Sequence, residues 1–172
     1  MALTNMYNVA TRDEMLSVQR AMATAIGKLS ARRGAFEVPF HGDVLYLDTL
    51  DEQAEDRHSG RLCPDRLDWL KSELEARQRP VIILSHHHIL RSGFDGMDAI
   101  PLRNGTEVAD MIAASGRCQM VINGHIHRII VSSYRGVTHA MIKSPRHQMP
   151  MVLGAGASSL SAAEPGGYGV FL

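Results

Sequence analysis

Residues 121–128 read Val-Ile-Asn-Gly-His-Ile-His-Arg, an apolar run that breaks at Asn-Gly and is followed by two histidines. On an extended backbone, alternate side chains lie on the same side of the strand. We therefore expect His125 and His127 to point together off the end of a buried strand, while Ile126 points back into the core. Two imidazoles that converge at a strand end suit a transition metal ion.

A second stretch ends in the same way, which argues against a chance pair of surface histidines. Residues 81–85 read Val-Ile-Ile-Leu-Ser and run directly into His86 and two further histidines. An apolar run without polar alternation is typical of a strand that is covered on both faces. Together, His86, His125 and His127 predict a zinc-type site with three protein ligands and one open position.

The sequence leaves open which neighbouring histidine would bind. His86 ranks first because it is the first residue beyond the apolar run, and His87 takes its place if the strand continues by one residue. The histidines that do not bind would pack, or would hydrogen bond to a ligand. A metal ion at this site would lower the pKa of its bound water toward neutrality and supply a hydroxide nucleophile.

Composition limits the class of protein. The 172 residues are enough for one domain with a substantial core, so we expect a single domain over residues 1–172. The 18 basic and 18 acidic residues balance, which disfavours nucleic acid and anionic membranes as partners. Cys63 and Cys118 give neither a disulfide framework nor a C-x-x-C metal pair. Because there is no membrane-length apolar run and no signal peptide, we expect a cytoplasmic location.

Hydrophobic periodicity predicts alternating helices and strands up to Ile122, and hairpins after it. Helices are expected over residues 11–34, 64–79 and 106–116, the last capped by Thr106. Strands are expected at residues 35–40, 44–47, 81–84, 119–122, 129–133, 137–142, 152–153 and 168–172, with a turn at His41. This pattern indicates a mixed α/β sheet protein with its chemistry at strand ends.

Short motifs recur in a specific order from Asp48 to the C-terminus. They are Leu-Asp-Thr at 47–49, Gly-Arg-Leu at 60–62, Leu-Asp-Trp-Leu at 67–70, Ser-His-His at 85–87, Leu-Arg-Asn-Gly at 102–105, Gly-His-Ile-His at 124–127, His-Gln at 147–148 and Glu-Pro at 164–165. The ordered set resembles the calcineurin-like metallophosphoesterases. Within that family it is most similar to the class III cyclic-nucleotide phosphodiesterase branch, which also contains glycerophosphodiesterases.

The resemblance implies a fold, an activity and a set of site residues. The fold is an αββα sandwich of mixed β-sheets flanked by helices, of which this chain would be an incomplete, C-terminal part with the N-terminal strands missing. The activity is hydrolysis of a small phosphate ester by a metal-activated hydroxide, with two divalent ions (Mn, Fe or Zn) in the family. Carried over by position, His86, His125 and His127 are metal ligands, and His147 is a catalytic residue near the substrate phosphate.

The first half of the family pattern is not matched. That half supplies Asp-x-His, Gly-Asp-x-x-Asp and Gly-Asn-His-Asp in series, and no such series precedes His86. In the register of the third motif, Asn8 keeps a metal-ligand position, but the histidine that helps the leaving group is Val9. The alternative is that Asn8 is an ordinary polar residue before a helix. Without the aspartates, little negative charge remains to hold two dications close together. We therefore expect one ion and an impaired phosphoesterase.

A different class of function is the alternative. Missing strands would expose a sheet edge and apolar surface, which favours association. The edge would be covered by a second copy, giving a homodimer, or by a complementing N-terminal segment. On this interpretation the chain is a non-catalytic metal-binding or dimerisation module derived from a phosphoesterase.

Overall fold

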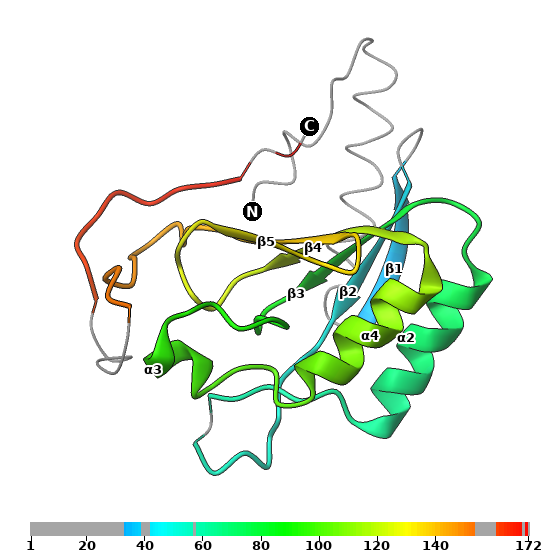
Figure 1. Ribbon diagram of the computed structural model, residues 1–172, viewed down its shortest axis with the longest axis horizontal. Helices are drawn as coiled ribbons and strands as arrows, with labels where there is room; N and C mark the ends of the chain where they lie inside the picture. Colours follow the sequence, from blue (N-terminus) through cyan, green and yellow to red (C-terminus); the bar gives the residue numbers. More distant parts are fainter. Residues whose placement is uncertain (1–32, 39–41, 57, 154–160, 170, 172) are drawn as a thin grey trace, which may run out of the picture.

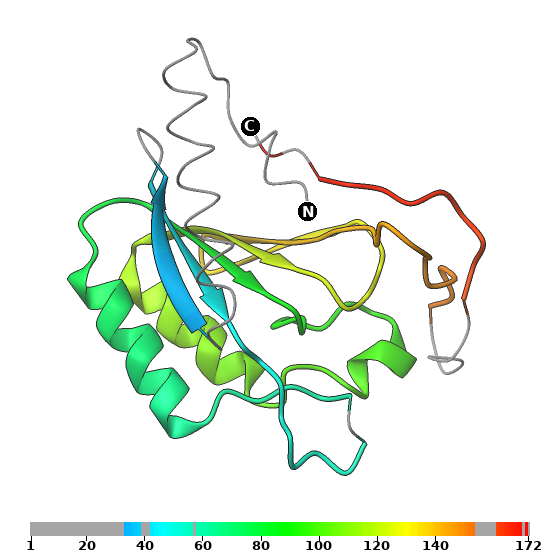
Figure 2. The ribbon, with the colours of Figure 1, turned by 180° about the vertical axis from the view of Figure 1, so that it is seen from behind.

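The computed structural model describes residues 33–38, 42–56, 58–153, 161–169 and 171. These residues form a six-stranded mixed sheet in the order β1-β2-β3-β4-β6-β5, with helices α2 and α4 together on one face (Figures 1 and 2). The predicted mixed α/β class is confirmed. Residues 11–32 of the expected first helix and the turn residue His41 lie outside the described residues, and a single domain over residues 1–172 stays a prediction.

The strands follow the apolar runs of the sequence. The parallel part of the sheet consists of β2 (Gly42–Leu47), β3 (Val81–Ser85), β4 (Cys118–Asn123) and β6 (Val137–Met141). At the two edges, β1 (Arg33–Val38) pairs antiparallel with β2, and β5 (Ile130–Tyr134) pairs antiparallel with β6. Parallel strands bring all their carboxyl ends to one edge of the sheet, so the histidines after β3 and β4 share that edge.

Two helices cover the parallel strands. Helix α2 (Pro64–Ala76) begins with a proline, which needs no hydrogen bond partner for its nitrogen at a first turn, and it buries Leu70 and Leu74 against the sheet. Helix α4 (Gly105–Ser115) ends at Gly116, whose φ of 62° is the left-handed conformation that a glycine adopts without strain. Both ends were predicted from the sequence.

Other predicted boundaries were wrong. Helix α4 is preceded by Asn104 rather than capped by Thr106, and the Asn104 side chain instead accepts from Leu62 N at 3.1 Å and donates to Leu62 O at 3.0 Å. The expected strands at 152–153 and 168–172 are not formed by the described residues of those segments. A short helix, α3 (Asp95–Asp98), was not expected in the loop after β3.

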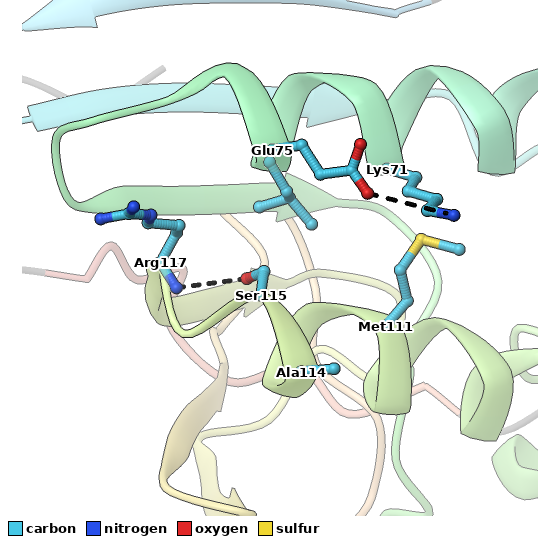
Figure 3. A pocket seen from close by; sticks show the side chains of 7 residues that line it. Lys71, Glu75, Met111, Ala114, Ser115 and Arg117 are labelled. Atoms are coloured by element: carbon cyan, nitrogen blue, oxygen red, sulfur yellow. Dashed lines mark hydrogen bonds and ion pairs between the residues drawn. The ribbon is translucent and has the colours of Figure 1, made fainter.

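A groove of about 540 Å³ lies between α2 and α4, lined in part by Leu74, Met111 and Arg117 (Figure 3). Arg117 directly precedes β4, whereas His125 follows the other end of that strand. The groove is therefore remote from the predicted metal site. None of the described helices is both long enough and apolar enough to cross a membrane.

Candidate metal centre

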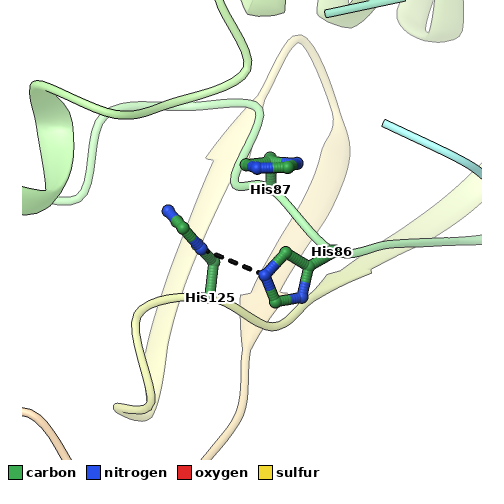
Figure 4. Close-up of side chains that lie close together, drawn as sticks. All are labelled: His86, His87 and His125. Atoms are coloured by element: carbon green, nitrogen blue, oxygen red, sulfur yellow. Dashed lines mark hydrogen bonds between the residues drawn. The ribbon is translucent and has the colours of Figure 1, made fainter. Parts of the chain in front are cut away.

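The sheet brings two histidines from distant parts of the sequence together. β3 and β4 are parallel neighbours with Ser85 opposite Asn123, so the residues that follow both strands emerge at the same edge. His86 Nε2 lies 3.1 Å from His125 Nδ1, a hydrogen bond that Figure 4 marks with a dashed line, and the two ring planes are inclined at 73°. The meeting of these two predicted ligands follows directly from the strand order.

The backbone after β4 is not the extended chain that the sequence suggested. β4 ends at Asn123, and both His125 and His127 have left-handed φ values, 64° and 55°. The chain turns because Gly124 N donates to His86 O at 3.1 Å and Ile126 N donates to Gly124 O at 2.7 Å. The alternation of a strand therefore does not orient these histidines, and that expectation was wrong. Ile126 is nevertheless fully buried, as predicted.

His87 lies beside the pair but has both ring nitrogens in hydrogen bonds. Its Nε2 is 2.9 Å from His58 O, and its Nδ1 is 2.7 Å from Thr49 Oγ1. A carbonyl only accepts, so Nε2 carries the proton and Nδ1 accepts from the threonine hydroxyl. The ring also packs against Gly60, where a Cβ atom would lie 2.5 Å from it. Although its ligand atoms lie within 4.8 Å of those of His86 and His125, His87 has no free lone pair for a metal.

His125, in contrast, directs a lone pair at His86. Its Nε2 lies 3.0 Å from Ile100 O and must donate to that carbonyl, which leaves Nδ1 unprotonated. Two imidazole nitrogens that share one tetrahedral zinc ion are roughly 3.3 Å apart, given Zn–N distances of about 2.0–2.1 Å. The observed separation of 3.1 Å is close to that value, so the pair fits a common ion.

Burial keeps the rings of His87 and His125 neutral at neutral pH. Burial lowers the pKa of His125 to about 3, with a further contribution from the neighbouring imidazoles of His87, His86 and His88. Burial and the neighbouring His86 lower the pKa of His87 to about 4. A metal ion requires a neutral imidazole, so His125 at neutral pH is already in the form that binds.

The structure does not bring His127 into the group formed by His86, His87 and His125. Its ring instead meets that of His147, with centroids 4.6 Å apart. The Nδ1 atom of His127 is buried and has no hydrogen bond partner, which fits a nitrogen available to a metal. Burial lowers the pKa of His127, and so do the nearby His147 and His86. Asn8 lies outside the described residues.

Several residues that hold the histidines were not recognised as such in the sequence. The Leu-Asp-Thr motif placed Thr49 after a strand, which was a usable signal for a polar contact near the site. The carbonyl oxygens of His58 and Ile100 leave no signal, because every residue has a carbonyl and only the folded loops direct these two at imidazole rings.

No protein-family model matches the chain. Among curated proteins, it is 34% identical over 106 residues to a probable cyclic nucleotide phosphodiesterase of Synechococcus, covering 58% of this chain and 41% of that protein. It is 27% identical over 118 residues to a probable glycerophosphodiester phosphodiesterase of Arcobacter nitrofigilis, covering 67% of this chain and 43% of that protein. In both cases the matched part is less than half of the relative's length.

A solved structure of a dimetal phosphatase from Danio rerio has a similar fold. The TM-score is 0.54 at 16% sequence identity, over 79% of this chain and 56% of that chain. At this level of identity the similarity shows a shared fold. It agrees with the mixed α/β sheet fold that the sequence predicted.

Proposed function

Because this chain is related to part of the class III cyclic nucleotide phosphodiesterases and glycerophosphodiesterases, within the calcineurin-like metallophosphoesterases, we propose that it binds a divalent metal ion and acts in the hydrolysis of a small phosphate ester. The observation that carries the proposal is the 3.1 Å approach of His86 Nε2 and His125 Nδ1. Imidazole ligands suit zinc, iron and manganese to differing degrees, so the metal is one of these.

Each histidine has a distinct proposed role. His86 and His125 are two ligands, and His127 is a third that approaches from the side of His147. Asn8 would add an oxygen ligand. When bound, the metal would polarise a phosphate oxygen and supply hydroxide at neutral pH. His147, half-buried beside His127, would exchange a proton with the substrate.

The charge of the site favours one ion over two. Among the described residues, the group of close potential ligand atoms consists of the imidazoles of His86, His87 and His125 and holds no carboxylate. Two dications about 4 Å apart repel by on the order of 16 kcal/mol at an effective dielectric constant of about 20, and neutral imidazoles do not offset this repulsion. We therefore propose a single ion and weak turnover by this chain, unless a complementing segment supplies carboxylates.

Calorimetric titration with Zn²⁺ or Mn²⁺, combined with hydrolysis of bis-p-nitrophenyl phosphate, tests the proposal. We expect one ion per chain and turnover well below the roughly 10 s⁻¹ that is typical of enzymes. His125→Ala should abolish both binding and turnover, whereas His58→Ala, at an exposed histidine, should preserve them.

The outcomes separate the candidate functions. Two tightly bound ions or ordinary turnover would contradict the single-ion account, and no binding would contradict the metal site. Size-exclusion chromatography of His125→Ala addresses the alternative: lost association with retained metal binding would favour the dimerisation module.

A further inference from the structure

The carboxylate of Asp98 is buried in the loop after β3, with 1% of its side chain exposed. Its Oδ1 accepts from Ser92 N at 2.7 Å, from Ser92 Oγ at 2.8 Å and from His88 Nε2 at 3.2 Å. Its Oδ2 accepts from Gly93 N at 3.0 Å and lies 3.6 Å from Arg91 Nε. A buried charge is costly unless it is paired and hydrogen bonded, and here it meets both conditions.

These contacts keep Asp98 ionised and fix the loop. Burial by itself would raise the pKa of Asp98, but the hydrogen bonds from Ser92 and Gly93 and the nearby His88 outweigh it and lower that pKa. The ionised carboxylate therefore remains a hydrogen bond acceptor. It joins the start of the loop, residues 88–93, to the end of helix α3.

The first connection from Asp98 to the metal centre is through the main chain. Ile100 lies two residues after Asp98, and its nitrogen donates to Met97 O at 3.0 Å in the turn that ends α3. The Ile100 carbonyl accepts from His125 Nε2 at 3.0 Å. Met97 and Phe94 also pack with Ile126, the buried residue next to His125. The position of α3 therefore determines where this carbonyl points.

The second connection is through His88. Its Nε2 donates to Asp98, and its ring stacks on that of His125 with centroids 5.7 Å apart and an interplanar angle of 20°. The hydrogen bond fixes the orientation of the His88 ring. The His88 ring in turn limits rotation of His125.

We propose that Asp98 is a positioning residue of the metal centre. Acting through the Ile100 carbonyl and the His88 ring, it holds His125 as the Nε2–H tautomer, so that the Nδ1 lone pair points toward His86. Groups that orient a ligating histidine through its other nitrogen fix the tautomer and the ring orientation. This inference rests on the proposed function to the extent that His125 is a ligand, but the tautomer itself is a property of the metal-free chain.

Asp98→Asn and Asp95→Asn form a matched pair, since both remove one carboxylate from α3 and Asp95 is exposed. Asparagine at position 98 would turn an NH₂ group toward one set of donors and lose their hydrogen bonds. In the metal-free 172-residue chain, ring ¹⁵N shifts should report the Nε2–H tautomer of His125 in the wild type and in Asp95→Asn, and a mixture of tautomers in Asp98→Asn. Affinity for Co²⁺ should fall by about 10–100-fold for Asp98→Asn alone, with an altered ligand-field spectrum.

An unchanged tautomer and unchanged Co²⁺ spectrum in folded Asp98→Asn would overturn the proposal. If Asp98→Asn does not fold, Ser92→Ala removes one hydrogen bond to the same carboxylate and should shift the tautomer in the same direction, and no shift would overturn the proposal. If the wild type does not bind Co²⁺, the proposed function fails, whereas the tautomer measurement still decides the role of Asp98.

Discussion

The two ends of the parallel strands use polar residues in different ways. At the amino end, the Asp43 side chain is 5% exposed and is paired with Arg77 at 3.4 Å and Arg79 at 3.6 Å. At the carboxyl end, the ring nitrogens of His86 and His125 approach to 3.1 Å. Opposite charges at the amino end compensate one another, so that end contributes to stability. The carboxyl end keeps lone pairs for a ligand, and we place the chemistry there.

The largest expected effect distinguishes His86 from His87 as the metal ligand, a choice that the sequence left open. His86→Ala should weaken Zn²⁺ binding by on the order of 100-fold or more, because it removes a direct ligand and loss of outer contacts alone costs about 10–100-fold. His87→Ala should instead lower the free energy of unfolding by about 1–3 kcal/mol, because it leaves Thr49 and the His58 carbonyl without their buried partner. Titration calorimetry and urea unfolding measure the two quantities.

A reversed result would assign the ligand to His87. In that case His87→Ala would lose the metal and His86→Ala would bind it normally. His58→Ala serves as the control, because its side chain is exposed and only its main-chain carbonyl contacts the site.

Asp43→Asn should lower the stability of the chain and leave metal binding almost unchanged. Removing the charge leaves Arg77 and Arg79 without a shared partner, so the free energy of unfolding should fall by about 1–3 kcal/mol. Zn²⁺ affinity should stay within about twofold of wild type, since β2 and β3 keep the carboxyl ends in register. A large loss of metal affinity would mean that the two ends of the sheet are coupled.

Acid should destabilise the metal-free chain through the histidines. Burial is the largest cause of a lowered pKa at His86, His87, His88, His125, His127 and His139. The unfolded chain takes up protons below about pH 6.5, whereas folded His87 and His125 resist protonation until about pH 4 and 3. Stability is therefore complete above pH 6.5 and declines as the pH falls toward those values.

Urea unfolding in EDTA at pH 7.5 and pH 5 measures this decline. The double variant His87→Ala/His125→Ala should lose less stability between the two pH values than the wild type does. An equal loss in both proteins would assign the acid sensitivity to other groups.

Much of the fold could be predicted because its signals are local. Pro64 and Gly116 mark helix ends through their own backbone restrictions, and the apolar runs before His86 and Asn123 mark buried strands. Helix α3 carried no such signal. Its four residues are held by contacts of Asp98 with the start of the same loop, not by periodicity.

The site could be predicted only in part. His86 and His125 could be paired because each lies just beyond an apolar run and parallel strands end at one edge. The left-handed turns at His125 and His127 could not, because their φ values depend on the burial of Ile126 and on hydrogen bonds from the Gly124 turn. For the same reason, the contact of His127 with His147 was not expected.

The sequence by itself determined the mixed α/β class, the family resemblance and the histidines that we propose as the site, because residue type and short-range order are sufficient for these. Only the tertiary structure decided which nitrogen of each imidazole carries the proton. That choice depends on the groups that meet the ring nitrogens, such as Thr49 Oγ1 at His87 or the Ile100 carbonyl at His125, and these partners come from distant loops.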